Sequence, residues 1–440
     1  MEKQQLQQLD LIDKVKELLK KYKISAYEIN LNIESGLSTT VRLGNVESIQ
    51  YHQSQNFSID VYSDNKKGSA NSVDFTTESL KKTIEAAYLI AKYTSKDKYL
   101  GLPPKNKLAF NVPDLDMYYP WDLQSDKSVA ISLECEQAAL ENKYVNNTEG
   151  AELSTFNSFI TYANSKDLVI SDKRSEHSLY CNAIAKNKSD MQVSYDYSVA
   201  IDNRDLKRAK FIGTKAAKLA VAKLNSSSLK SQKCSVIFHA NIASGLFSAL
   251  LSALSGTKQY HKSTFLLNSI DKIIFPDWIN IYEDPLRMKT IGVRAFDSDG
   301  VKTKKQYFIK NGAIKSYLLS QYSANQLGLK TTANAGGVHN LIINTSKQNF
   351  KDLLKTMDEG ILVTELMGQG INITTGDYSR GASGFWVENG EIKYPVSGFT
   401  VADNLENMFN NIVAISDDTD KRKNIKTGSV LISEMTIGGD

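Results

Sequence analysis

The 440-residue chain has few of the side chains that build metal centres or covalent frameworks. Its three cysteines, Cys135, Cys181 and Cys234, lie far apart and in no Cys-x-x-Cys spacing, which argues against a disulfide framework and a zinc ribbon. Its five histidines fall singly, with no two within one helical turn of each other. A hydrolytic zinc site needs about three protein ligands and an open position for water. No His-Glu-x-x-His or His-Glu-x-x-x-His motif supplies such ligands.

An excess of one sign of charge and a long apolar run are also missing. The 53 basic and 49 acidic residues give a net charge of +4, which is too balanced for an electrostatic argument about nucleic acid. The most apolar long run, residues 242–254, contains three serines and is too short to span a bilayer. The N-terminal stretch lacks the uninterrupted apolar core of a signal peptide. We therefore expect a cytoplasmic protein with no membrane partner and no nucleic-acid partner.

The length predicts more than one domain, because a chain of this size is too long for one ordinary core. We expect an N-terminal α+β domain at residues 1–100, a central domain at 101–228 and a C-terminal β-rich, metallopeptidase-like domain at 229–440. The central domain would begin with a proline-rich segment, residues 101–122, which holds four of the seven prolines. The polar run Asn225-Ser226-Ser227-Ser228 marks the boundary before the third domain.

The predicted elements of the first domain make a mixed α/β unit with antiparallel strands. An amphipathic helix that ends near Tyr22 opens the chain, and a second helix starts near Thr76. Between them, alternation of polar and apolar residues predicts short strands at 28–33, 39–43, 46–51, 57–62 and 68–73. Turn residues at Gly44-Asn45 and Asp64-Asn65 predict two hairpins.

The rest of the chain completes an α+β fold. In the central domain we expect helices at about 125–142 and 204–224, with several strands between them at 145–202. The C-terminal domain is predicted to be mostly antiparallel β and to carry one buried helix at 242–254. That helix has no charged residue, which is typical of a core helix.

A glycine-rich stretch, residues 367–395, is the most distinctive part of the sequence. It is not a P-loop or a dinucleotide fingerprint, because the required Lys-Ser/Thr and third glycine are absent. Asn389-Gly390 predicts a hairpin. Two interpretations stay open: strand backbone beside the glycines holds an extended peptide by β-augmentation, or the glycines make tight turns and let two sheets pack. The first interpretation places six residues in a substrate groove or interface: Asn372, Tyr378, Arg380, Phe385, Trp386 and His339.

This stretch and five other segments together resemble one known family. The segments are Lys67-Gly68-Ser69-Ala70, Asn147-Thr148-Glu149-Gly150, Lys262 to Leu267, Phe296 to Gly300, and Ala335 to Asn340. In this order they resemble the PmbA (TldE) branch of the TldD/PmbA metallopeptidase family, and the likeness runs nearly end to end. The resemblance implies a protein of the metallopeptidase class of hydrolases.

The resemblance also implies that this chain has no catalytic residue and no metal of its own. The TldD branch carries a His-Glu-x-x-x-His helix and a distant cysteine ligand. The segment at Lys262 sets a register in which Ser248 and Ala253 take the two histidine positions and Ala249 takes the glutamate position. Thr427, before Gly428, takes the cysteine position. Zinc is therefore expected in a TldD-like partner rather than here.

The function that the resemblance implies is that of a subunit in a heterodimeric TldD–TldE-type complex. Its substrates would be unfolded or small peptides, since the family is implicated in microcin maturation and antitoxin degradation. The partner would supply zinc, and this chain would shape the chamber. The alternative is a homodimeric peptide-binding or regulatory protein without hydrolysis, and a third possibility is autonomous hydrolysis with unusual ligands. A TldD-like gene in the same genome would favour the first hypothesis.

Overall fold

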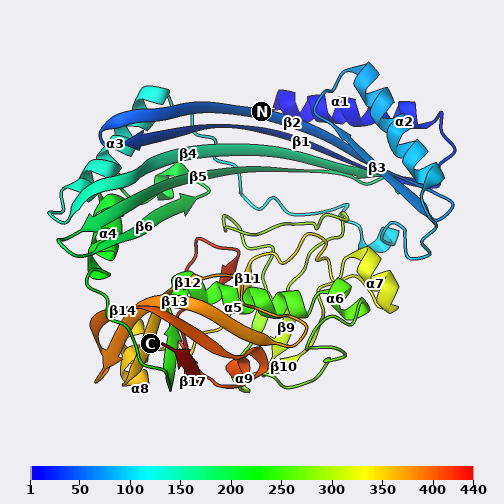
Figure 1. The fold of residues 1–440 in the computed structure, drawn as a ribbon. Coiled ribbons are helices and arrows are strands. Elements are labelled where there is room, and N and C mark those ends of the chain that lie inside the picture. Colours follow the sequence, from blue (N-terminus) through cyan, green and yellow to red (C-terminus); the bar gives the residue numbers. More distant parts are fainter. Residues whose placement is uncertain (1, 440) are drawn as a thin grey trace.

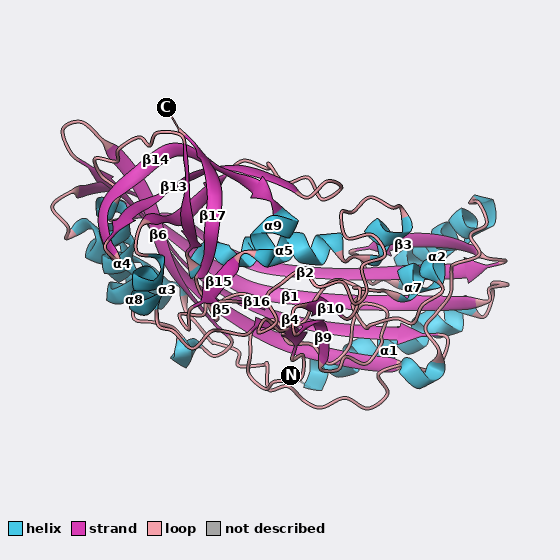
Figure 2. Cartoon of the chain, turned by 90° about the horizontal axis from the view of Figure 1, so that it is seen from below, coloured by secondary structure: helices cyan, strands magenta, loops and turns pink. Residues whose placement is uncertain are grey.

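The computed structural model describes residues 2–439 and has two layers. A long curved sheet arches over a C-terminal module (Figure 1). The described residues contain nine α-helices and three sheets, so the predicted α+β class is confirmed. Figure 2, seen from below, shows the long strands running side by side.

The curved sheet is antiparallel throughout and has the strand order β3-β2-β1-β4-β5-β6. Because β1 pairs with β4 from Glu28↔Asn164 to Val41↔Ala151, residues from both expected N-terminal domains share this one sheet. The boundary expected near residue 100 stays a prediction. The six strands are β1 (Ala26–Arg42), β2 (Asn45–Ser63), β3 (Lys66–Ser72), β4 (Val145–Asn164), β5 (Val169–Lys186) and β6 (Met191–Ala200).

The prediction of short strands in the first domain was wrong. The strand expected near 28–33 and the one near 39–43 are both parts of β1, and β2 likewise runs unbroken through two expected strands. Gly36 sits in the middle of β1, where a Cβ would lie 2.1 Å from the carbonyl oxygen of Thr155. The glycine therefore allows a close approach of β4 to β1 rather than breaking the strand.

Helices pack on the convex face of the sheet at its two ends, so its concave face is turned towards the C-terminal module (Figure 1). At one end α1 (Glu2–Leu19) and α2 (Thr77–Tyr93) bury apolar residues such as Val15 and Ile84 against the strands. The Thr76 hydroxyl caps α2 by accepting from the backbone N–H of Ser79 at 3.4 Å, as the sequence predicts.

At the other end α3 (Ser125–Leu140) and α4 (Ala209–Ala222) pack on each other and on the sheet. The helix expected over 204–224 begins at Ala209, because a short 3₁₀ turn, Asn203–Asp205, precedes it. None of the described helices is long and apolar enough to cross a membrane.

The C-terminal module is built on a closed ring of five strands. The order β14-β13-β12-β7-β17 returns to its start because β14 also pairs with β17. All these pairs are antiparallel except β7 with β12. The predicted hairpin forms, with Asn389 and Gly390 both at positive φ between β13 and β14. The ring strands are β7 (Gln232–Phe238), β12 (Gly360–Met367), β13 (Asp377–Glu388), β14 (Glu391–Asn404) and β17 (Val430–Gly438), and β15 (Ile412–Ile415) adds to β17.

A smaller sheet and five helices complete this module, so the prediction of a single helix in it was wrong. The missed helices are five to eight residues long, too short for a periodic signal. The helices are α5 (Ala240–Ala253), α6 (Gly256–Tyr260), α7 (Gln321–Leu327), α8 (Phe350–Met357) and α9 (Leu405–Asn410). The small sheet is formed by β8 (Ile281–Glu283), β9 (Gln306–Lys310), β10 (Ala313–Ile314), β11 (Leu341–Ile343) and β16 (Ile425–Lys426).

Candidate functional site

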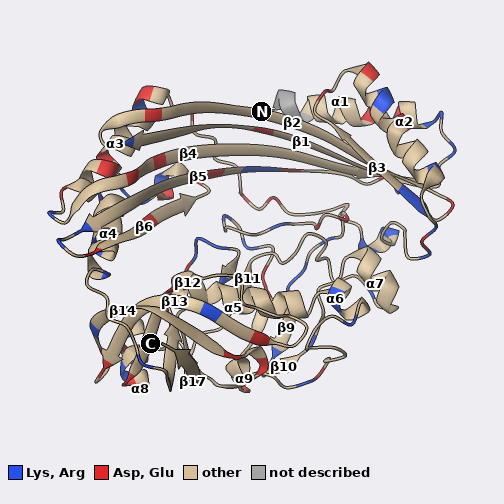
Figure 3. Ribbon diagram, in the orientation of Figure 1, with Lys and Arg blue, Asp and Glu red and all other residues tan. Residues whose placement is uncertain are grey.

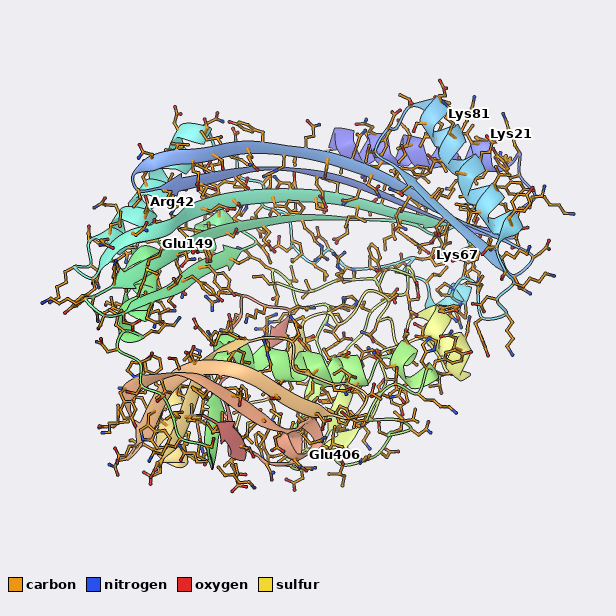
Figure 4. The ribbon with its side chains drawn as sticks, in the orientation of Figure 1. Lys21, Arg42, Lys67, Lys81, Glu149 and Glu406 are labelled. Atoms are coloured by element: carbon orange, nitrogen blue, oxygen red, sulfur yellow. The ribbon has the colours of Figure 1, made fainter. Side chains whose placement is uncertain are left out.

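Several cavities lie between the curved sheet and the C-terminal module, and two of them are each lined by a histidine. The larger, here the central cavity, has a volume of about 790 Å³ and lies under the middle of the concave face. The second, here the end cavity, has a volume of about 510 Å³ and lies between β6, α4 and the start of α5. Figure 4 shows side chains of both layers projecting into the space between them.

One wall of the central cavity is made by neighbouring side chains on three strands of the sheet. Glu34 of β1 is opposite Ser158 of β4, which is opposite Arg174 of β5. In the next row Phe156 is opposite Glu176. Residues of one row in adjacent strands point to the same face of a sheet. The sheet therefore presents one cation, two carboxyl groups and an aromatic ring to the cavity.

The opposite wall comes from loops of the C-terminal module, including Arg294, Asp297, Ser298 and His339. Asp297 accepts hydrogen bonds from the backbone N–H groups of Val301 at 2.8 Å and of Ala335 at 3.0 Å. Burial, and then the nearby Asp299, raise the pKa of Asp297 to about 7. This carboxyl group holds two loops of the wall together.

Glu283 of β8 fixes the loop that carries His339. Its carboxylate accepts from the backbone N–H of His339 at 2.7 Å, from Asn334 Nδ2 at 2.9 Å and from Gln306 Nε2 at 2.9 Å. Burial raises the pKa of Glu283 to about 7, in spite of these donors. Glu283 acts on the cavity through His339 and is a positioning residue.

His339 is a neutral histidine on the cavity wall. Its side chain is buried, with 5% exposed. Burial, followed by the charge of Arg294, lowers the pKa of His339 to about 4. Its Nε2 atom has no hydrogen-bond partner within residues 2–439. A neutral imidazole with a free nitrogen in a cavity can accept from or donate to a ligand.

The end cavity, in contrast, has cations that are already paired. Lys223 pairs with Glu365, and Arg422 pairs with Asp420 at 2.8 Å and with Asp196 at 3.3 Å. His239, at the start of α5, accepts from the backbone N–H of Asn241 through Nδ1 at 3.3 Å. The cations of the end cavity are thus engaged in ion pairs that hold the two layers together.

The four positions that the resemblance identifies as degenerate do not form a zinc site. Ser248 is exposed on α5, whereas Ala249, Ala253 and Thr427 are buried. None of the four side chains offers an imidazole, carboxylate or thiolate. Within the described part of the chain, no three His, Cys, Asp or Glu side chains gather closely enough to hold a metal ion.

The six residues predicted for a groove or interface are not brought to one surface. Tyr378 is 2% exposed and packs in the ring core with its side chain against Phe238, and Trp386 packs against the same core. Asn372 is exposed in the turn before β13, and Arg380 is half-buried. Phe385 lines the end cavity and His339 lines the central cavity. Alternation along β13 separates Phe385 from Trp386, and Asn372 and His339 lie outside that strand.

Sequence reasoning missed the two arginines of the central cavity and Glu283. Arg174 and Arg294 are two of only eight arginines in the chain. Arg294 lies two residues before the segment Phe296 to Gly300, which carries part of the family resemblance. That position and the scarcity of arginine are the available signals. Arg174 and Arg294 reach the same cavity only because the two layers pack together, and this leaves no pattern in the sequence.

Comparison with known proteins decides the family. Three family models match the chain. They describe the PmbA/TldA metallopeptidase domain 1 at residues 27–91, the central domain at 118–224 and the C-terminal domain at 231–439. The chain belongs to the PmbA/TldD metallopeptidase family. It is 41% identical to metalloprotease PmbA of Escherichia coli O157:H7 over 94% of this chain and 92% of that one. It is 40% identical to a PmbA homologue of Buchnera aphidicola from Acyrthosiphon pisum, over 99% of this chain and 98% of that one.

Other relatives place the chain within the family and support the fold. A Buchnera aphidicola TldD homologue is 23% identical over 44% of this chain. A crystal structure of a Bacteroides thetaiotaomicron protein matches with a TM-score of 0.93 and 25% identity, covering 98% of each chain. TldE from Thermococcus kodakarensis matches with a TM-score of 0.81 and 22% identity, covering 98% of this chain and all of that one, and this likeness concerns the fold.

Proposed function

We propose that this chain is the non-catalytic subunit of a cytoplasmic TldD–TldE-type metallopeptidase that acts on unfolded or small peptides. In this proposal a TldD-like partner holds zinc and supplies the hydrolytic chemistry. The observation that carries it is that Ser248, Ala249, Ala253 and Thr427 stand at the ligand and base positions. No step of hydrolysis is assigned to residues of this chain.

The state of α5 supports the proposal. The helix keeps a complete apolar face against the core, with Phe247, Leu250 and Ala253 fully buried. Its other face carries Ser244, Ser248 and Ser252, which offer hydroxyl groups but no metal ligand of the kind that zinc prefers. The helix therefore retains its packing role without catalytic groups, and relatives named PmbA match nearly the whole chain.

The contribution of this chain would be to shape the space in which peptides bind. The central cavity is bounded on one side by a sheet and on the other by the C-terminal module. A cavity of about 790 Å³ falls in the range of small-ligand sites. It can admit a short extended segment, whereas a folded domain is excluded by its size. Figure 3 shows acidic and basic residues interspersed over both layers, without a continuous face of one sign.

The test is to produce this chain with a TldD-like subunit from the same genome, and each subunit alone. We expect the two to co-purify, zinc to follow the partner, and an unstructured peptide to be cleaved by the pair. Hydrolysis by this chain alone that is lost with a metal chelator would overturn the proposal. Peptide binding by a homodimer of this chain, with no association with the partner, would support the non-hydrolytic alternative instead.

A further inference from the structure

Two arginines lie on opposite walls of the central cavity. Arg174 projects from β5 of the curved sheet, and Arg294 comes from a loop of the C-terminal module. Burial, and then the charge of Arg174, lower the pKa of Arg294. Both charges also act on His339, which lines the same wall as Arg294. Three potential donors, Arg174, Arg294 and His339, therefore line one cavity.

The two guanidinium groups are incompletely paired. Arg294 is half-buried, and its side chain makes no hydrogen bond or ion pair with any residue that the structure describes. Arg174 donates from Nε to Asp172 at 2.5 Å, but its buried Nη2 has no partner within the same residues. In contrast, Arg204 and Arg422 each use two nitrogens on a single carboxylate. A buried cation without a partner is costly, so such a site favours binding of an anion.

Apart from Asp172, which pairs with Arg174 Nε, the acidic residues nearby do not satisfy these arginines. Asp297 is held by backbone N–H groups, and Glu283 by Asn334, Gln306 and the N–H of His339. Glu34 accepts from Asn32 Nδ2 at 2.7 Å. Burial raises the pKa of Glu176, and Arg174 opposes this effect without coming into ion-pair distance. The carboxyl groups of the cavity are thus engaged elsewhere, and the fork of Arg294 stays available.

The remaining lining indicates an organic anion rather than a bare inorganic one. Much of the surface beside the arginines is apolar and would pack against hydrocarbon. The apolar lining residues include Met117, Phe156, Ile160, Ile201, Phe296 and Val338. Apolar walls with a few polar groups at one place are typical of sites that bind small organic ligands. The planar fork of arginine matches the two oxygens of a carboxylate.

We propose that the central cavity is a carboxylate-binding site, in which Arg174 and Arg294 hold a carboxylate of a bound peptide and His339 Nε2 contacts the same group. The carboxylate is the C-terminal one or that of an acidic side chain. The arginine site follows from residues of this chain alone, whereas the peptide nature of the ligand rests on the proposed function. The neighbouring apolar surface would hold the residue that carries the carboxylate.

The experiment measures peptide binding to the full chain by titration calorimetry. Three unstructured hexapeptides of one apolar sequence are compared: the free C-terminal acid, the C-terminal amide, and the amide with one internal Glu. We expect at least one carboxylate form to bind at least tenfold more tightly than the plain amide. The form that does so identifies the source of the carboxylate. Arg294→Met should abolish this preference, while Arg208→Met, at an exposed arginine outside the cavity, should keep it.

A second variant and a stability measurement distinguish the loss of a binding contact from misfolding of Arg294→Met. Arg174→Lys keeps the charge but loses the fork, so it should reduce the preference for the carboxylate form at least threefold. The thermal midpoint of the ligand-free Arg294→Met protein should equal or exceed that of the wild type, because an unpaired charge has been removed. The midpoint of the wild type should rise with the carboxylate peptide.

Three results would overturn the carboxylate site. Equal affinity for all three peptides would do so and would leave peptide binding, and the proposed function, intact. Arg294-dependent binding of inorganic phosphate that is tighter than that of any peptide would replace the peptide carboxylate by a free anion. No binding of any peptide would reject the site, while cleavage of the same peptides by the reconstituted pair would still support the proposed function.

Discussion

The guanidinium group of Arg422 lies 4.0 Å from the centre of the Tyr197 ring and joins the C-terminal module to β6 of the curved sheet. The same side chain donates from Nη1 to the backbone carbonyl of Tyr197 at 3.0 Å. It also pairs with the buried carboxylates of Asp196 and Asp420. One arginine therefore connects the two layers by stacking, hydrogen bonding and charge, and it forms part of the end cavity.

Replacing Arg422 with Met should destabilise the protein by about 3 kcal/mol, because it leaves Asp420 without its bidentate partner. Asp196 would keep Lys215 at 3.2 Å, which limits the loss on that side. Urea unfolding at pH 7 measures the change. Arg287→Met, at an exposed arginine, is the control and should alter stability by less than about 0.5 kcal/mol. Equal stability of the two variants would show that Arg422 does not tie the layers together.

Two glycines of β13 differ in what they allow. A Cβ on Gly384 would lie 1.9 Å from the carbonyl oxygen of Leu362, whereas a Cβ on Gly381 would lie 3.5 Å from its nearest neighbour, in Met367. We therefore expect Gly384→Ala to cost about 3 kcal/mol or more of stability. Gly381→Ala should cost less than about 0.5 kcal/mol. Thermal or urea unfolding of both variants measures this difference, and similar losses would contradict the close approach at Gly384.

This contrast bears on the two interpretations of the glycine-rich stretch. At Gly384 the glycine is needed because β12 passes close to β13, which supports the packing interpretation at that position. The groove interpretation depended on large side chains exposed beside the glycines. Tyr378 faces the core of the ring, and Trp386 packs against that core. Burial also raises the pKa of Tyr378 to about 12.

His339 should make stability depend on pH in a defined direction. Its pKa is lowered from 6.5 to about 4 in the folded chain. Between these values the unfolded chain takes up a proton and the folded chain does not, so folding stability falls as the pH falls from 6.5 towards 4. His339→Gln does not titrate, and the stability of the wild type relative to this variant should fall by about 2 to 3 kcal/mol between pH 7 and 4.5.

The comparison of the two proteins isolates His339 from other buried groups. Asp297 and Glu283 have pKa values raised to about 7, so they stabilise the fold as the pH falls. They act in both proteins, and their effect cancels in the difference to first order. His52→Gln, at an exposed histidine, is the control. A difference between wild type and His339→Gln that stays constant with pH would contradict a neutral His339.

Local signals in the sequence predicted local structure well. The Asn389-Gly390 turn and the Thr76 cap depend on a few adjacent residues, and both form as expected. The unbroken β1 and β2 were not predictable in this way. Their length is set by pairing of β1 with β4, more than a hundred residues away, and by the close contact at Gly36. Nonlocal pairing of this kind overrides local strand propensity.

The candidate site was less predictable than the fold. Arg174, Arg294 and His339 come from three distant parts of the chain, and only the packing of two layers brings them to one cavity. His339 is among the groove or interface residues predicted from the sequence, but nothing in the sequence indicated that the side chain would be neutral and buried. That state depends on burial and on the charge of Arg294, which are both tertiary effects.

The last prediction concerns metal binding by α5. The wild-type chain should contain far less than one zinc ion per chain when purified without chelator, because none of the four degenerate positions carries a zinc ligand. The double variant Ser248→His with Ala249→Glu should still bind no stoichiometric zinc. One imidazole and one carboxylate fall short of the usual three ligands, and Ala253 and Thr427 add none.

Adding the missing zinc ligand at Ala253 should be limited by packing in the core rather than by the chemistry of the ligand. Ala253 is fully buried, and its carbonyl accepts from Thr264 Oγ1 at 2.8 Å and from Gln259 Nε2 at 3.2 Å. An imidazole there overfills the core, so Ala253→His should destabilise the chain by about 1 to 3 kcal/mol. Ser248→His, at an exposed position, is the matched control and should stay within about 0.5 kcal/mol of the wild type. Elemental analysis and thermal unfolding of the same samples measure both effects. About one zinc per wild-type chain, or chelator-sensitive hydrolysis by the double variant without a partner, would show that α5 in this chain is a working metal-site helix.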